Sequence, residues 1–326
     1  MDLTGLHHLT AVTGRAAQNL AFYTETLGLR LVKKTVNQDD VSAYHLFYAD
    51  ETGSPGTDVT FFDWAWASPA RAGTETVSET ALRVPTGALA WWQERLPEVG
   101  VTPAEIADHS GRPSLAFTDP EGQHLRLVED GAPPAGVPWS GSSVPAAAQI
   151  RGLHDVTLQV AALAPTLQVL TEVIGFRPIE ERAVDGGQLV VLETGPGGPG
   201  TEVRVVATPA APRGRVGIGG VHHVAFRVPD DAAHEAWQAR IAAAGLGVTP
   251  IIDRFYFRSI YFREPGGILF EIATDGPGFT ADEPATELGQ HLALPPFLEP
   301  RRAEIEANLR PLPAVAVATS ARRVAG

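Results

Sequence analysis

Apolar and polar residues alternate along short stretches of the chain, and this alternation predicts β-strands. Two stretches with the pattern are residues 222–228 and 268–273. Their apolar positions are Val224, Phe226, Val228, Ile268, Phe270 and Ile272. Successive side chains of a strand point to opposite faces, so this apolar set is expected to pack beneath a helix. His223 and Glu271 lie on the other face, and we expect them to share that face of the sheet.

These stretches belong to a module that the chain repeats four times. The stretch 152-GLHDVT-157 repeats 5-GLHHLT-10, and 224-VAFRVP-229 repeats 80-TALRVP-85. Each is followed by apolar residues at helical spacing and then by Gly- and Pro-marked turns that lead to a closing strand. The closing strands are 56-GTDVTFFDW-64, 122-GQHLRLVE-129, 200-GTEVRVVA-207 and 267-GILFEIAT-274. The pattern predicts modules of a strand, a helix and about three further strands, each about 60 to 80 residues long.

The modules set the expected division of the chain. Residues 1–130 hold modules one and two, and residues 149–276 hold modules three and four. Residues 131–148 are rich in Pro, Gly and Ser, which predicts a linker between these halves. Residues 277–326 form a Pro-rich C-terminal tail with one short helix near residues 300–309.

Composition narrows the range of functions. The chain has 326 residues, of which 44% are hydrophobic, and a net charge of -13. Phosphate binding needs clustered Lys and Arg, so a nucleic-acid partner is not expected. No segment approaches the roughly 18 to 20 apolar residues of a membrane span and no secretion signal is visible, so we expect a cytoplasmic protein. The chain has no cysteine, so a metal would be held by imidazole and carboxylate groups, which suit iron, manganese, nickel or zinc.

Aligning the four modules places chemically informative residues in two columns. The first-strand column is His8, Glu79, Asp155 and His223, and the last-strand column is Thr60, Arg126, Arg204 and Glu271. If module one pairs with module four, this pair of modules contains both histidines and Glu271, which is the triad of non-heme iron enzymes. The other pair of modules then contains two acids and two arginines, which are expected to compensate one another as ion pairs without a metal. Pairing module one with module two would leave neither pair of modules with two histidines from these columns, so we favour the first arrangement.

The repeated modules resemble the vicinal oxygen chelate superfamily, which includes glyoxalases, bleomycin resistance proteins and extradiol dioxygenases. The resemblance covers about residues 4 to 276. It implies an α+β fold in which four βαβββ modules form two cup-shaped mixed β-sheets, with helices outside and a metal site on a concave face.

Within that superfamily, the chain is similar to the ring-cleaving hydroquinone 1,2-dioxygenases, whose metal ligands come from modules one and four. The matching positions are His8, His223 and Glu271, and the similarity extends through residues 253–279 and 295–306. The resemblance implies a non-heme Fe(II) enzyme, with Mn(II) as the alternative metal, that cleaves para-dihydroxy aromatic rings and inserts both atoms of O2. The expected partners are therefore a small aromatic substrate and O2, and a homo-oligomer is compatible with the chain.

The same resemblance assigns roles to three further residues near the metal. Tyr261 would donate to the bound oxygen, Arg254 would hold the distal hydroxyl, and His222 would act as acid or base. Strand alternation instead points His222 toward the helix side, and whether His222 and His7 reach the metal site stays open. The other histidines have no partner that spacing identifies and are expected to be surface or core residues: His45, His109, His124, His154, His234 and His291.

Three other functions remain as alternatives. A catechol-type extradiol dioxygenase would use the same metal site on a different ring. A glyoxalase-like isomerase or lyase of this superfamily typically has four protein ligands, and Thr60 in the fourth place argues against it. A metal-free small-molecule binding protein would have no reason to keep two histidines and a carboxylate on one face.

Overall fold

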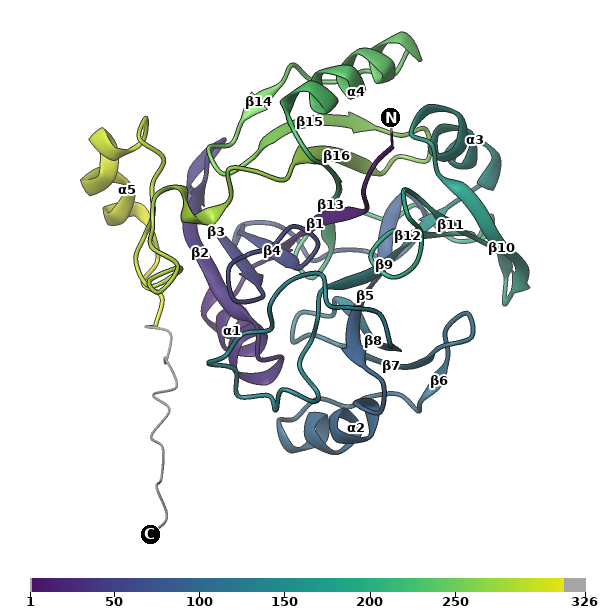
Figure 1. Cartoon of the computed structure of the whole chain (residues 1–326), viewed down its shortest axis with the longest axis horizontal. Coiled ribbons are helices and arrows are strands. Elements are labelled where there is room, and N and C mark those ends of the chain that lie inside the picture. Colours follow the sequence, from purple (N-terminus) through teal and green to yellow (C-terminus); the bar gives the residue numbers. More distant parts are fainter. Residues whose placement is uncertain (1, 314–326) are drawn as a thin grey trace.

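Two curled eight-stranded sheets with helices on their outer sides make up residues 2–313, the part of the chain that this computed structural model describes (Figure 1). Each sheet takes one module from residues 1–130 and one from residues 149–276. Every module has the predicted βαβββ order, and the predicted fold class is confirmed. The end of the predicted tail, residues 314–326, lies outside the described residues.

The first sheet joins modules one and four in the strand order β14-β15-β16-β13-β1-β4-β3-β2. Module one contains β1 (Leu6–Thr13), α1 (Ala16–Ala21), the π-helical turn η1 (Phe22–Thr26), β2 (Arg30–Asn37), β3 (Asp40–Ala49) and β4 (Asp58–Asp63). Module four contains β13 (Val221–Val228), α4 (Asp231–Ala243), β14 (Ile252–Asp253), β15 (Arg258–Arg263) and β16 (Leu269–Thr274). Strands β1 and β13 pair antiparallel in the middle of the sheet, so an approximate twofold axis at this seam relates the two modules. The predicted pairing of module one with module four is confirmed.

The second sheet joins modules two and three in the strand order β10-β11-β12-β9-β5-β8-β7-β6. Module two contains β5 (Thr76–Pro85), α2 (Leu89–Glu98), β6 (Ala107–Asp108), β7 (Pro113–Thr118) and β8 (His124–Asp130). Module three contains β9 (Leu153–Val160), α3 (Leu163–Gln168), the π-helical turn η2 (Val169–Val173), β10 (Arg177–Val184), β11 (Gly187–Glu193) and β12 (Glu202–Ala207). The first strands of its two modules, β5 and β9, pair antiparallel in the middle of the sheet, as β1 and β13 do in the first sheet. The two sheets therefore have the same topology.

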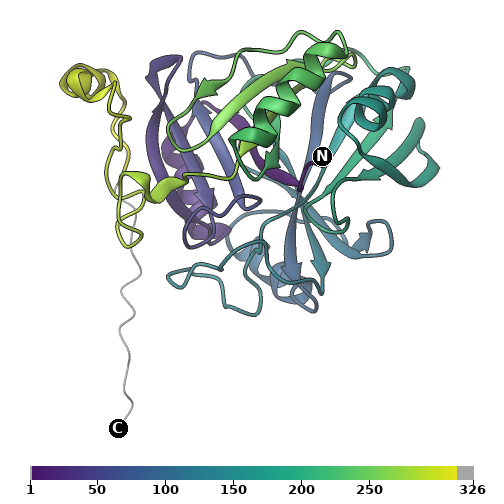
Figure 2. The same cartoon turned by 45° about the horizontal axis from the view of Figure 1, so that its top comes forward.

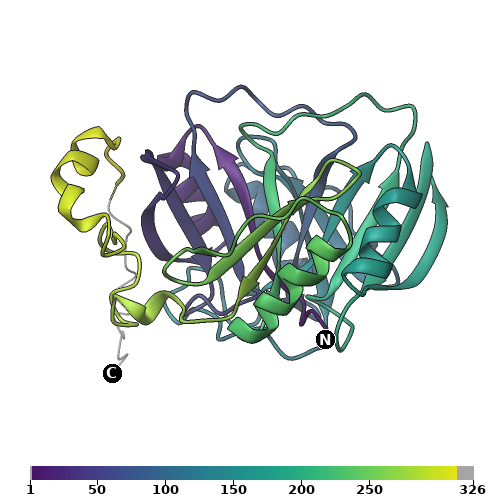
Figure 3. The ribbon, with the colours of Figure 1, turned by 90° about the horizontal axis from the view of Figure 1, so that it is seen from above.

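The helices cover the outer faces of the sheets, as Figures 2 and 3 show for α4 in front of β15 and β16. Helix α4 begins where the Asp230 carboxylate accepts a hydrogen bond from the backbone N–H of Ala233. The apolar set that strand alternation predicts beneath this helix is buried: Val224, Phe226, Val228, Ile268, Phe270 and Ile272. The polar residues that alternate with these apolar residues therefore lie on the inner, concave face of the sheet. No helix in the described part of the chain is long and apolar enough to cross a membrane.

The predicted linker, residues 131–148, contains neither helix nor strand and runs along module one. The backbone N–H of Val137 donates to Asp50 at 2.7 Å, and the Ser142 hydroxyl donates to the carbonyl of Gly28 at 2.7 Å. Its assignment as a boundary between two domains stays a prediction.

The described part of the tail packs beside β2 and contains η3 (Phe279–Ala281), η4 (Glu299–Arg301) and α5 (Arg302–Asn308). A buried ammonium group holds the start of this segment. Lys33 on β2 lies 2.7 Å from Asp282 and forms a second ion pair with Glu283. The same ammonium lies 4.7 Å from the ring centre of Tyr256. The tail is thus tied to the first sheet by charge as well as by apolar contacts.

We expect Lys33→Met to lower the free energy of unfolding by about 2 kcal/mol, because it leaves two acidic side chains without their shared cation. The loss should be smaller than for fully buried pairs, since the two carboxylates keep 19% and 11% of their exposure and stay partly hydrated. Urea unfolding measures the change. As a control, Arg182→Met removes the exposed pair with Glu180 and should cost at most about 0.5 kcal/mol. Equal losses in the two variants would contradict the role given to Lys33.

Candidate metal centre and its pocket

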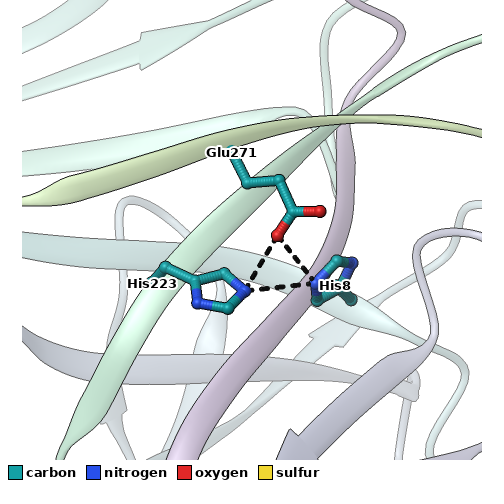
Figure 4. A group of neighbouring side chains, drawn as sticks. All are labelled: His8, His223 and Glu271. Carbon is teal, nitrogen blue, oxygen red and sulfur yellow. Dashed lines mark hydrogen bonds and ion pairs between the residues drawn. The ribbon is translucent and has the colours of Figure 1, made fainter. Parts of the chain in front are cut away.

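The structure brings the three predicted metal ligands together at the seam of the first sheet (Figure 4). His8 comes from β1, His223 from β13 and Glu271 from β16. Glu271 Oε2 lies 3.3 Å from His8 Nε2 and 2.9 Å from His223 Nε2, and the two imidazole nitrogens are 3.4 Å apart. All three side chains are buried.

The spacing of these atoms fits one divalent ion. Two ligands about 2.1 Å from an ion and at right angles to each other are about 3.0 Å apart, close to the observed spacings. Glu271 Oε2 is buried and accepts no well-formed hydrogen bond from the described residues, which leaves its lone pairs available. Two imidazoles and one carboxylate on one side of an ion leave its other side open to further ligands.

Two β-bulges at the seam determine how the adjacent histidines lie. Strand β1 has one extra residue, His7, opposite β13, and β13 has one extra residue, His222, opposite β1. A bulge re-aims the side chain of the extra residue, so simple strand alternation does not apply to it. The side chains of His7 and His222 each contact Nδ1 of the next histidine in the chain, which is the ring nitrogen that faces away from Glu271.

His7 determines which nitrogen His8 presents to the centre. His7 Nε2 lies 3.1 Å from the carbonyl of Thr274, which can only accept, so this nitrogen carries the proton. His7 Nδ1 must then accept from His8 Nδ1 at 2.9 Å, and the lone pair of His8 is left on Nε2, facing Glu271. Burial and the neighbouring His8 lower the pKa of His7 to about 3, so the ring is neutral.

His222 stands in the corresponding position behind His223. The Nδ1 atoms of the two rings are 2.8 Å apart, and His222 packs edge-on against Phe62 and Trp64. Burial and the neighbouring His223 lower the pKa of His222 to about 3. His222 therefore contacts the nitrogen of His223 that faces away from Glu271, and its role as acid or base stays a prediction.

Glu271 is oriented by a hydroxyl group on the neighbouring strand. The Ser259 hydroxyl on β15 donates to Glu271 Oε1 at 2.5 Å. Burial alone would raise the pKa of Glu271, but the adjacent His8 and His223 hold it well below its usual range. The carboxylate is thus ionised and points its second oxygen at the two imidazoles.

A pocket opens onto this centre, and both Arg254 and Tyr261 line it. The Arg254 guanidinium lies 2.8 Å from Asp39 and sits 5.6 Å from the ring centre of Tyr261. Burial and the nearby Glu271 raise the pKa of Tyr261, so its hydroxyl keeps its proton at neutral pH. The rest of the wall combines residues 35–39 with a group of aromatic side chains that includes Phe47, Phe62, Tyr256 and Phe257. The structure brings both predicted residues to the pocket, and their roles stay predictions.

His45, expected to be a surface or core residue, also lines the pocket, and that expectation is wrong. It lies on β3 with Phe47, and its Nε2 is 2.9 Å from the hydroxyl of Thr60. The same hydroxyl lies 2.8 Å from that of Thr10. A sign of this position was present in the sequence, because residues 45 and 47 share a strand face, but no repeat motif marks β3.

The second sheet compensates its charges only partly as expected. Arg126 forms a two-pronged ion pair with Glu79, at 2.8 and 2.9 Å, as predicted. Asp155 does not pair with an arginine. It accepts instead from His109 Nε2 and His154 Nδ1, each at 2.7 Å.

His109 and His154 are buried, which agrees with the expected core position, and Asp155 is a partner that spacing did not identify. His154 is an extra residue of β9 at the second seam, in the position of His7, and His109 lies in the loop after β6. These three side chains are buried and near enough to surround an ion. However, the two 2.7 Å contacts are ordinary hydrogen-bond lengths, shorter than the spacing of about 3.0 Å expected around a metal. We describe the group as a hydrogen-bonded His-Asp-His cluster.

Comparison with known proteins agrees with this geometry. The family model described as "Glyoxalase/Bleomycin resistance protein/Dioxygenase superfamily" matches residues 5–127 and 152–272. The Bacillus subtilis protein named "Putative ring-cleaving dioxygenase MhqA" is 49% identical over 315 residues, which cover 96% of this chain and 100% of the relative. The Sphingobium indicum protein named "Chlorohydroquinone/hydroquinone 1,2-dioxygenase" is 33% identical over 92% of this chain and 94% of its own length.

Solved structures show the same fold. A structure titled as a putative dioxygenase from Bacillus subtilis has a TM-score of 0.89 and 40% identity, covering 95% of this chain and 98% of its own. Glyoxalase I from Zea mays has a TM-score of 0.63 at 16% identity, covering 89% of this chain and 98% of its own. The second likeness concerns the fold alone.

We expect Ser259→Ala to weaken binding of a divalent cation about 10- to 100-fold, because Glu271 would lose the hydrogen bond that orients it. Competition with a chromophoric chelator measures the affinity. Ser114 occupies the corresponding position of module two, where its hydroxyl donates to the carbonyl of Ala107. Ser114→Ala is thus a matched control that should leave cation affinity unchanged, and equal affinities for all three proteins would count against the centre.

Proposed function

Since the chain belongs to the glyoxalase/bleomycin resistance protein/dioxygenase superfamily, we propose that it is a non-heme iron(II) ring-cleaving dioxygenase that opens para-dihydroxy aromatic rings. Both atoms of O2 would be incorporated into the product. The observation that carries this proposal is the buried centre of His8, His223 and Glu271, in which residues 2–313 supply three ligands and no fourth.

The residue in the fourth position favours a dioxygenase over a glyoxalase-like isomerase. Thr60 occupies the place that corresponds to Glu271, and its hydroxyl is engaged by Thr10 and His45. A three-ligand centre can accept a substrate oxygen and O2 together, whereas a four-ligand centre has fewer free positions. The name of the Sphingobium indicum relative supports a hydroquinone as the substrate class.

The residues of the centre would hold the metal and set its charge. An iron(II) ion bound there supplies open coordination positions for a phenolic oxygen and for O2. His7 and the Thr274 carbonyl keep His8 in the tautomer that presents Nε2. Glu271 contributes one negative charge against two neutral imidazoles, so a divalent ion keeps a net positive charge that favours the ionised form of a phenol.

The pocket residues would orient the ring and hold a proton. Tyr261 keeps its hydroxyl proton and can donate it in a hydrogen bond to an oxygen near His223. Arg254, held by Asp39, offers N–H groups to the hydroxyl on the far side of the ring. The aromatic walls pack against the ring and exclude water, which strengthens these polar contacts.

The proposed metal is iron rather than manganese. The proposed location is the cytoplasm, because a reducing compartment keeps iron in its reduced form. Fractionation of cells that produce the protein tests the location, and recovery with the membrane or outside the cell would contradict it. A homo-oligomer is compatible with the chain, and light scattering after size exclusion gives the mass directly.

We expect iron(II)-loaded protein to consume O2 with hydroquinone, methylhydroquinone or chlorohydroquinone, and His8→Ala and Glu271→Ala to abolish the uptake. An oxygen electrode measures it after anaerobic loading, with manganese(II) and catechol run in parallel. Uptake only with catechol would favour the ortho-diol alternative. No uptake with any diol by protein that holds one metal would contradict the proposed reaction.

Tyr261→Phe should lower kcat about 100-fold with metal content unchanged, because a positioned proton donor typically contributes at least this factor. Steady-state kinetics with hydroquinone measure the change. Tyr44 lies on the opposite face of β3 from the pocket, so Tyr44→Phe serves as the control and should keep the wild-type kcat. An unchanged kcat in Tyr261→Phe would remove Tyr261 from the proposed machinery.

A further inference from the structure

The twofold relation within the first sheet gives His45 an equivalent residue. On β4, Thr60 lies beside Thr10 of β1, and on β16, Glu271 lies beside Ala225 of β13. Thr10 follows His8 by two residues, and Ala225 likewise follows His223 by two residues. Thr60 is therefore the structural counterpart of Glu271. One strand further out, His45 is placed relative to Thr60 as Ser259 is relative to Glu271.

The two equivalent pairs make equivalent hydrogen bonds. Ser259 bonds to Glu271 at 2.5 Å, and His45 bonds to Thr60 at 2.9 Å. On one side of the twofold axis, the Ser259–Glu271 pair provides a carboxylate that can bind a metal. On the other side, the His45–Thr60 pair provides an imidazole and a hydroxyl, and no carboxylate. The side of the centre across from Glu271 is therefore the side on which the described residues supply no metal ligand.

The ring of His45 is held firmly on that side. Its centre lies 4.0 Å from that of Phe47 and 4.5 Å from that of Phe62, and Nε2 is fixed by Thr60. The Nδ1 atom forms no hydrogen bond with any described residue, although the side chain lines the pocket. In the other three modules the equivalent positions hold Ser114, Leu189 and Ser259, so the sheet itself does not require an imidazole here.

We propose that His45 is a substrate-positioning residue whose Nδ1 hydrogen-bonds the ring hydroxyl that is not held at the metal. This inference rests on the proposed function, because it takes an aromatic diol as the substrate. It adds a second polar contact to that of Arg254, and it gives the pocket a means to distinguish a diol from a phenol. Nδ1 can donate or accept, since the Thr60 hydroxyl can adapt to either tautomer.

The test compares hydroquinone with phenol, which lacks the second hydroxyl, as ligands of the iron(II)-loaded protein under anaerobic conditions. Calorimetric titration gives both dissociation constants. In His45→Leu, which carries the residue that module three has at this place, hydroquinone should bind about three- to tenfold more weakly and phenol equally well. His45→Gln should recover part of the loss, because an amide can still make the hydrogen bond. His124→Leu, at an exposed histidine of the second sheet, should match the wild type.

Three outcomes would overturn the inference. Equal weakening of both ligands would mean that His45 acts on the metal-held oxygen or on pocket shape, and no weakening of either would mean that it makes no contact. Metal content and circular dichroism of each variant show that the protein is loaded and folded. Failure of the proposed function is separate, because it appears as absent O2 uptake in the wild type, whereas this comparison needs binding alone. A wild type that binds hydroquinone no better than phenol would also overturn it.

Discussion

The antiparallel pairing of β1 with β13 is the constraint on which the rest of the site depends. Because side chains alternate along a strand, one seam places His8 and His223 on the same concave face, although 215 positions separate them. The parallel pairing of β13 with β16 then adds Glu271 at the next strand. The apolar residues between them are committed to the opposite face, beneath α4, so the polar set has no other place to lie.

The β-bulges at this seam place a second histidine behind each of the two ligand histidines. The extra residues His7 and His222 stand behind the two ligand histidines and bond to their outer nitrogens. A buried imidazole without such a partner could present either nitrogen, and only the hydrogen bond to its outer nitrogen selects Nε2 for the metal. The second sheet keeps the same seam and the same kind of bulge, at His154, but Asp155 stands where a ligand histidine would be. Oδ2 of its carboxylate accepts hydrogen bonds from His109 and His154, at lengths ordinary for hydrogen bonds. Its Oδ1 and His154 Nε2 are buried and form no hydrogen bond with the described residues.

Repetition and alternation made the order of elements in each module, the pairing of modules and the meeting of His8, His223 and Glu271 predictable from the sequence, whereas the cup-shaped sheets were expected from the resemblance to the superfamily. Repetition and alternation are local sequence patterns that have the same effect on the arrangement of strands in any protein. The residues that escaped prediction depend on contacts that no local pattern encodes. His109 lies in a loop and reaches Asp155 across 46 positions, and His45 lies on a strand whose sequence does not repeat between modules. For His222, alternation pointed the wrong way because the bulge adds a residue that the sequence does not announce.

Anomalous diffraction at the iron edge, from crystals of the iron(II)-loaded protein, locates the bound metal. We expect one strong peak at the seam of the first sheet, within bonding distance of His8 Nε2, His223 Nε2 and Glu271 Oε2, and no iron peak at the His109, His154 and Asp155 cluster. An iron peak at that cluster, or a seam without iron, would contradict the assignment of the metal centre to the first sheet.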